Sequence, residues 1–171
     1  MELPGGLAMA DLGDDRDGLR LDRLHVPLGP VLSDWPAGLV LRVVLQGDVI
    51  QDATAEVLDA GHGSVFWQGP GLAAARELDA LARFLGVAGW ADTAARARRL
   101  RDDLLAGAPA GRVADPARAL LRRVRRSRTL RWLVRGIPAG PVDVAALVEQ
   151  RTAAVEAALA ESAPPAGGER A

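Results

Sequence analysis

Residues 39–58 read LVLRVVLQGDVIQDATAEVL, and this stretch decides the first half of the fold. Gly47-Asp48 separates two runs rich in strand-forming residues, which is a typical signal for a hairpin turn. The second run alternates small apolar with polar side chains: Ala53, Thr54, Ala55, Glu56, Val57. Alternation of this kind predicts a strand with one face toward solvent.

A further strand precedes this hairpin. Its apolar residues alternate in two short runs with a phase slip near Arg23: Leu19, Leu21, Leu24, Val26, Leu28. Gly29-Pro30 then opens a loop. We therefore predict a three-stranded antiparallel sheet over residues 19–58, with His25 on its solvent face.

The rest of the chain has the periodicity of helices. Apolar residues spaced by three and four predict four helices, over about residues 71–87, 91–106, 116–134 and 141–161. Asp115-Pro116 is expected to cap and open the third helix, and Pro141 or Asp143 the fourth.

These elements predict an α+β fold, in which a small N-terminal antiparallel sheet of three strands precedes a four-helix bundle. We expect a single domain over residues 18–161, with the sheet at 19–58 and the helices at 71–161. Residues 1–17 are acidic and rich in Gly, and are expected to form a flexible arm. Residues 162–171 are expected to be a disordered tail.

The composition excludes several kinds of chemistry. The chain has no Cys, Tyr, Asn or Lys, so all 21 basic residues are Arg. Without Cys there are no disulfides, cysteine zinc sites or thiol nucleophiles, and without Lys no Schiff base or phosphate-loop lysine. The two histidines, His25 and His62, are isolated and are expected to lie in a strand and in a Gly-rich loop. A non-catalytic protein without cofactors is the expectation.

The formal net charge of −1 conceals a strong asymmetry. Residues 1–60 hold 11 acidic side chains and four Arg, whereas residues 116–171 hold five acidic side chains and ten Arg. Such a separation indicates either a complementary contact within the chain or a charged partner.

The basic excess is concentrated in the predicted third helix. Eight arginines fall within residues 118–135, and no acidic residue lies between Pro116 and Val142. Together with one tryptophan they form the predicted partner-binding surface: Arg118, Arg122, Arg123, Arg125, Arg126, Arg128, Arg131, Trp132, Arg135.

Three partners suit this surface, in decreasing order of preference: an acidic protein surface, a peripheral anionic membrane, and nucleic acid. The acidic first half and an aromatic content of 4% argue against nucleic acid. Most of the four tryptophans are expected at core edges, with partner anchoring as the alternative: Trp35, Trp67, Trp90, Trp132.

The predicted sheet also carries a motif of turn residues in a recognisable order: Gly29, Pro30, Gly38, Arg42, Gly47, Asp48. This order resembles the N-terminal sheet of the superfamily that contains the D (quinone-site) subunit of respiratory complex I and the large subunits of nickel–iron hydrogenases. The resemblance covers about 30 residues. A weaker likeness to the helix pair of that superfamily includes Arg96-Ala97 and Arg101.

The chain departs from that superfamily where its chemistry resides. The catalytic loop of the family carries a His where this chain has residues 31–35, VLSDW, and the hydrogenase metal ligands and quinone-site tyrosine have no counterpart here. The resemblance therefore implies a reduced relative without redox chemistry. We expect a non-catalytic accessory subunit of a larger complex, located in the cytoplasm or peripheral to the inner face of the membrane. The alternative is a binder of anionic surfaces that uses the same helix, and a third possibility is an enzyme that uses Asp34 in the loop from Gly29 to Gly38.

Overall fold

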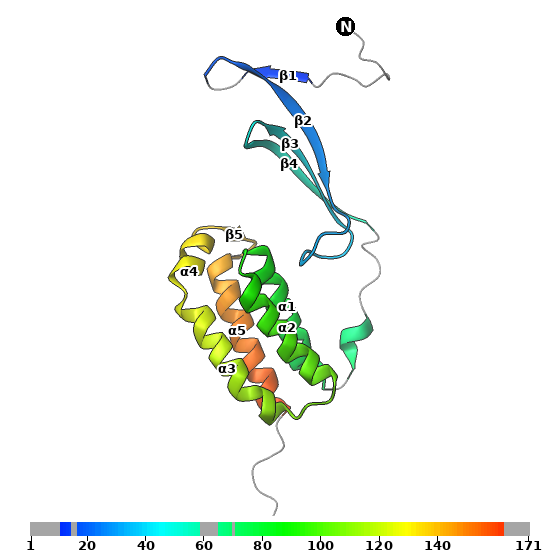
Figure 1. Ribbon diagram of the computed structural model, residues 1–171, viewed down its shortest axis with the longest axis vertical. Coiled ribbons are helices and arrows are strands. Elements are labelled where there is room, and N and C mark those ends of the chain that lie inside the picture. Colours follow the sequence, from blue (N-terminus) through cyan, green and yellow to red (C-terminus); the bar gives the residue numbers. More distant parts are fainter. Residues whose placement is uncertain (1–10, 15–16, 59–64, 70, 163–171) are drawn as a thin grey trace, which may run out of the picture. The chain divides into compact units, whose positions relative to one another are not determined.

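The computed structural model describes residues 11–14, 17–58, 65–69 and 71–162, and it divides the chain into two units, residues 1–63 and 64–171. The first unit is a sheet and the second is helical (Figure 1). The division falls between the predicted sheet and the predicted helices. The sequence had indicated one continuous domain over residues 18–161. His62 and the tail from 163 lie outside the described residues.

The sheet has four antiparallel strands in the order β1-β2-β3-β4. Their bounds are Asp11–Asp14, Arg20–Leu28, Leu39–Gln46 and Val49–Val57. The prediction of three strands is therefore wrong by one: β1 lies within the stretch expected as a flexible arm. Sequence periodicity missed β1 because backbone pairing with β2 forms it, and because the Gln46 amide donates a hydrogen bond of 2.7 Å to the Gly13 carbonyl.

The strand register gives the sheet one apolar and one polar face. Val26, Val43 and Ala53 lie opposite one another across β2, β3 and β4, and so do Leu28, Leu41 and Ala55. The intervening residues are mainly polar and fall on the other face: His25, Arg42, Asp52, Thr54, Glu56. Polar and apolar side chains alternate as predicted, and His25 is exposed as expected. The expectation that only one face of the last strand meets solvent is wrong, because every residue of β4 is exposed.

Two glycines of the turn motif are required by the backbone. Gly29 has φ +108°, and a Cβ atom there would collide with the carbonyl oxygen of Leu39. Gly38 has φ +79°, and a Cβ atom would lie 2.5 Å from the carbonyl oxygen of Leu58. Both positions therefore require glycine for steric reasons at the ends of the loop, and these reasons are independent of function.

The helical unit is built from four long helices and one short one. The long helices are α1 (Ala73–Val87), α2 (Ala91–Leu105), α3 (Ala110–Arg126) and α5 (Val144–Glu161). α1 and α3 each pack against both α2 and α5, so the four form a closed ring (Figure 1). A four-helix bundle is thus roughly matched, with α4 (Arg128–Val134) as a fifth helix.

The predicted third helix over 116–134 begins too late and is interrupted, although its predicted end coincides with the end of α4 at Val134. α3 begins at Ala110, so Pro116 lies inside the helix and does not open it. Ser127 then ends α3 and caps α4, because its hydroxyl accepts a hydrogen bond of 3.1 Å from the Leu130 amide. A two-residue pair of strands, β5 (Pro138–Ala139) and β6 (Val142–Asp143), precedes α5, and the Asp143 carboxylate caps α5 as expected. A short 3₁₀ helix, Val65–Gln68, stands at the start of the unit.

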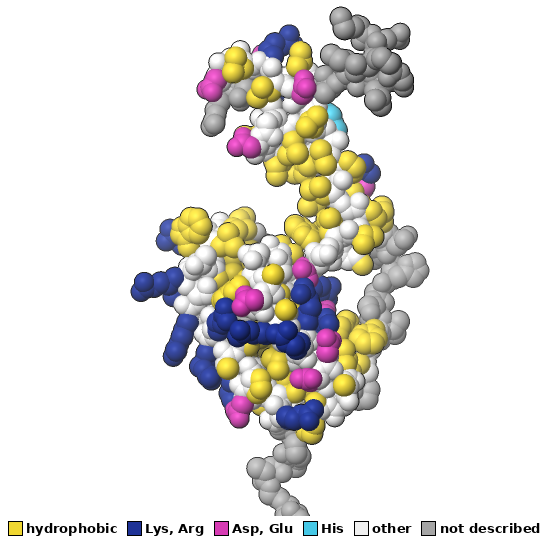
Figure 2. All heavy atoms as spheres, in the orientation of Figure 1, with side chains coloured by type: hydrophobic (Ala, Val, Ile, Leu, Met, Phe, Trp, Pro, Cys, Tyr) yellow, Lys and Arg dark blue, Asp and Glu magenta, His cyan; other side chains and the backbone are white. Residues whose placement is uncertain are grey.

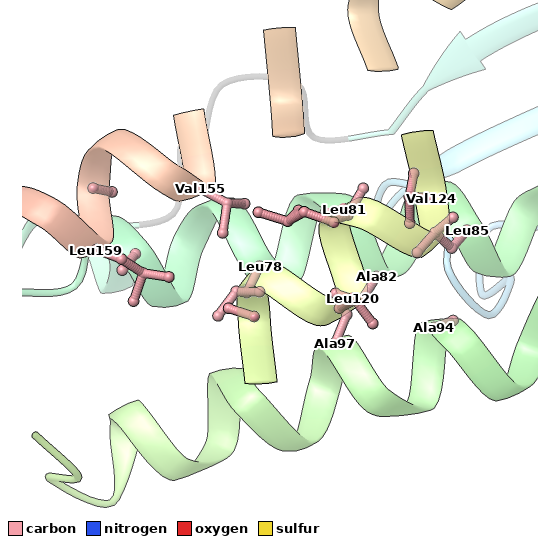
Figure 3. Packing of buried hydrophobic residues seen from close by; sticks show 14 of the residues in the cluster. Leu78, Leu81, Ala82, Leu85, Ala94, Ala97, Leu120, Val124, Val155 and Leu159 are labelled. Carbon is pink, nitrogen blue, oxygen red and sulfur yellow. The ribbon is translucent and has the colours of Figure 1, made fainter. Parts of the chain in front are cut away.

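The core of the bundle is made of Leu, Val and Ala. Its largest fully buried members include Leu78, Leu81, Leu85 and Leu121. The first three point toward the centre between the helices (Figure 3). Ala82, Ala94 and Ala97 are also fully buried, and their small side chains let α1 and α2 approach closely. Burial of this apolar surface is the main source of stability.

Shortening a core leucine should therefore destabilise the bundle. We expect Leu121→Ala to lower the free energy of unfolding by about 3 kcal/mol, because the site is closed on all sides and a cavity would remain. Leu105→Ala is the control, since Leu105 is 39% exposed at the end of α2 and should cost less than about 1 kcal/mol. Urea denaturation followed by circular dichroism measures both. Equal losses would contradict the assigned core.

The turn glycines allow a second matched pair. Gly18 has φ +75° with open space around it, whereas Gly38 has a similar φ and a carbonyl oxygen in the way. We expect Gly18→Ala to cost about 1 kcal/mol and Gly38→Ala at least about 1 kcal/mol more. Amide hydrogen exchange of β3 and β4 measures the loss, and similar protection in both variants would show that the approach to Leu58 is not constraining.

Candidate interaction surface

α3 divides its surface between the core and solvent. Its buried side carries Val113, Ala117, Leu120, Leu121 and Val124. The arginines of α3 lie outside this buried side, as the sequence predicts. Cationic side chains project from the side of the helical unit where α3 and α4 lie (Figure 2).

Arg125 is not part of a free surface. Its guanidinium donates two hydrogen bonds, of 2.8 and 2.9 Å, to the two carboxylate oxygens of Glu156 on α5. Its Nε donates a third, of 3.1 Å, to the buried hydroxyl of Thr152. The hydrogen bonds from Arg125 lower the pKa of Glu156 below its ordinary value, with burial opposing and the charges of Arg125 and Arg118 assisting. This side chain therefore joins α3 to α5, and its guanidinium is already engaged within the bundle.

Arg123 and Arg118 are also engaged. Arg123 Nη2 lies 3.0 Å from the Asp92 carboxylate of α2, and its guanidinium lies 5.3 Å from the centre of the Trp90 ring. Arg118 pairs with Asp115 one turn earlier on α3. Both side chains remain exposed, but their charges are already compensated, so they offer a partner less than the sequence suggested.

Two further ion pairs complete a set that the sequence did not predict. Asp79 on α1 pairs with Arg101 on α2 at 2.5 Å, and Glu77 on α1 pairs with Arg151 on α5 at 3.0 Å. With Arg123–Asp92 and Arg125–Glu156, each of the four contacts in the helix ring carries at least one ion pair. Glu77 and Asp79 are only 8% exposed. The one pattern in the sequence that could have indicated an ion pair here is the i, i+4 spacing of Asp79 and Arg83 on α1.

Five arginines remain for a partner, and we name them the Arg face: Arg122, Arg126, Arg128, Arg131, Arg135. All five are exposed. Within the described part of the chain none of them forms an ion pair, and Arg131 makes only a long hydrogen bond of 3.4 Å to the Ser127 carbonyl. Their charge is thus available for an external anion.

Large apolar side chains stand beside the Arg face. Trp132 is 73% exposed, and Leu133 and Ile137 are about half exposed on and after α4. The expectation of a core-edge position fails for Trp132, because α4 buries only Leu130 and Val134. Trp90, by contrast, packs against the core as expected.

The turn motif lies in the other unit. Gly47 and Asp48 close the β3–β4 hairpin, and Arg42 pairs with Glu56 of β4 at 2.6 Å on the polar face. Pro30 and Gly38 border a hollow of about 550 Å³ that is lined by apolar residues of the loop, Trp35 among them. Asp34, the candidate for catalysis, has φ +69° and lies outside that lining.

Two kinds of feature are absent among the described residues. No helix among them is both long and apolar enough to cross a lipid bilayer. No three His, Asp or Glu side chains among them gather closely enough to hold a metal ion.

The Arg125–Glu156 pair should make stability depend on pH. Because folding lowers the pKa of Glu156, its contribution is fully present above about pH 4.5 and is lost as the pH falls through the lower value. We expect Glu156→Gln to cost about 1 kcal/mol at neutral pH, since solvent reaches the pair, and to cost progressively less below pH 4.5. Chemical denaturation at several pH values measures this. Glu161→Gln is the control at the end of α5, and a pH-independent cost for Glu156→Gln would contradict the assignment.

Comparison of the chain with protein-family models, curated proteins and solved structures gives no match. A functional proposal therefore rests on the arrangement of the arginines on α3 and α4.

Proposed function

We propose that this protein is a non-catalytic interaction subunit that docks onto an acidic protein surface through the Arg face. The observation that carries the proposal is the division of the arginines on α3 and α4. Some are used within the bundle, and five exposed ones are left without a carboxylate among the described residues.

Arginine suits carboxylate recognition for a geometric reason. Its planar guanidinium presents two parallel N–H groups to a carboxylate, as Arg125 does to Glu156 inside the bundle. Arg122 and Arg126 are one turn apart on α3, so two carboxylates on a neighbouring surface could be bound together. Trp132 supplies the kind of rigid apolar side chain that anchors protein interfaces.

The resemblance to the complex I D subunit and hydrogenase large subunits belongs to the same proposal. It rests on the turn motif, in which Gly29 and Gly38 are backbone requirements of the loop that joins β2 to β3. A reduced relative that kept this scaffold would act as an accessory subunit of a larger complex. We place it in the cytoplasm or at the inner face of a membrane as part of that proposal.

The docking proposal predicts a charge-dependent and site-specific loss of binding. The protein would be immobilised and used to capture partners at about 0.1 M and 0.5 M NaCl. We expect Arg122→Gln/Arg126→Gln to reduce capture of an acidic protein about tenfold at the lower salt, whereas Arg96→Gln/Arg99→Gln on α2 removes the same charge with little effect. Recovery of nucleic acid or lipid alone, with no protein, would refute the interaction subunit.

A second candidate, an anionic membrane surface, is favoured by one specific feature. Trp132, Leu133 and Ile137 are exposed next to Arg131 and Arg135, which is the composition of an interfacial helix. If this candidate is correct, the protein should sediment with vesicles that contain phosphatidylserine and not with neutral ones, and Trp132→Ala should reduce sedimentation several-fold. Trp35→Ala is the control, since Trp35 is also exposed but lies in the sheet unit. Equal sedimentation with both kinds of vesicle would exclude an electrostatic membrane contact.

A further inference from the structure

A hollow opens in the helical unit between α4 and the turn that joins α1 to α2. It has a volume of about 290 Å³, and its lining includes Ala88, Trp90, Ser127, Thr129, Leu130 and Leu133. Its wall therefore combines apolar side chains with those of Ser127 and Thr129. It stands at the junction where α3 ends and the Arg face continues into α4.

The walls of this hollow are held in place before any partner arrives. Arg123 lies over the ring of Trp90 and is itself fixed by Asp92. Leu130 is almost fully buried, and its amide donates to the Ser127 hydroxyl at the start of α4. A preformed wall lowers the entropy lost on binding, so a small contact can contribute measurably.

The size of the hollow limits what can fill it. Sites for cofactors and drug-sized ligands begin at about 300 Å³ and are usually much larger. A volume of about 290 Å³ is at the lower limit of such sites and is large enough to take one bulky side chain. Interface anchors are side chains of this kind, seated in a pocket and surrounded by polar contacts.

The charged side chains beside the hollow that remain unpaired are positive. Arg126 and Arg128 flank Ser127 in the chain, and both are exposed and free of ion pairs among the described residues. Asp92 carries a negative charge near Trp90, but it already pairs with Arg123. A segment that places an apolar side chain in the hollow would thus meet free guanidinium groups beside it, which favours carboxylates at its flanks.

We propose that this hollow receives a bulky apolar side chain from an acidic segment of the partner protein, with Asp or Glu residues of that segment bound by Arg126 and Arg128. This inference rests on the proposed function and specifies the partner: an acidic segment with one apolar anchor. Charge alone would bind many acidic surfaces, and the anchor adds the selectivity.

Three synthetic helical peptides test the inference on the full-length protein. The first carries a central Leu among Glu residues, the second replaces this Leu with Ala, and the third keeps the Leu and replaces each Glu with Gln. Each peptide is labelled with fluorescein and titrated by fluorescence anisotropy at about 0.1 M NaCl. We expect the first peptide to bind about tenfold more tightly than either of the others.

Two protein variants locate the contact. Leu133→Ser removes a wall of the hollow from a side chain that is 44% exposed, and Leu105→Ser changes a leucine of similar exposure that does not line it. We expect Leu133→Ser to weaken the first peptide about five- to tenfold and Leu105→Ser to leave it unchanged. Circular dichroism of both variants checks that the bundle remains folded.

The outcomes separate this inference from the function on which it rests. Equal affinity for the Leu and Ala peptides, or no effect of Leu133→Ser, overturns the anchor in the hollow and leaves a charge contact through the Arg face intact. Equal affinity for the Glu and Gln peptides overturns the acidic partner in both proposals. Failure of all three peptides to bind overturns the inference, whereas the salt-dependent capture described above decides the interaction subunit separately.

Discussion

Two buried carboxylates on α1 set the condition that the rest of the bundle satisfies. Glu77 and Asp79 lie among the leucines of the core edge and are almost removed from water. An unpaired carboxylate in that position would be strongly destabilising. Each has one arginine on α1 itself, Arg76 for Glu77 and Arg83 for Asp79. Each also has one from a neighbouring helix, Arg151 on α5 and Arg101 on α2. Hydrophobic burial drives α1 into the bundle, and these inter-helix pairs add a polar contact on each side of it.

The arginines of α3 and α4 divide between helix contacts and solvent. The contacts of α3 with its two neighbours also carry ion pairs, since Arg123 reaches Asp92 on α2 and Arg125 reaches Glu156 on α5. Four guanidinium groups thus serve the ring of helices, one at each contact. The residues of the Arg face lie where no helix packs, which is why their charge stays unpaired within the described chain. Internal pairing and external recognition therefore use the same chemistry at different positions on one helix.

The sequence predicted the parts of this structure that depend on local pattern. Alternation gave the β3–β4 hairpin and the outward position of His25, and the spacing of apolar residues gave four helical stretches. It did not give β1, which depends on pairing with β2 and on a hydrogen bond from Gln46 across the sheet. It also missed the break at Ser127, because a serine cap acts within one turn and leaves the arginine pattern continuous.

The candidate surface shows the same limit more sharply. Eight arginines on one predicted helix look equivalent in the sequence, yet only their partners distinguish them, and those partners lie on α2 and α5, far along the chain. Periodicity can say that Arg125 is off the core face, but only the packing of α3 against α5 brings Glu156 and Thr152 to it. A count of charges therefore overstates a binding surface whenever the fold supplies counter-ions. Subtracting the internal pairs leaves a smaller cationic patch with an exposed tryptophan beside it, and that remainder is what a partner can recognise.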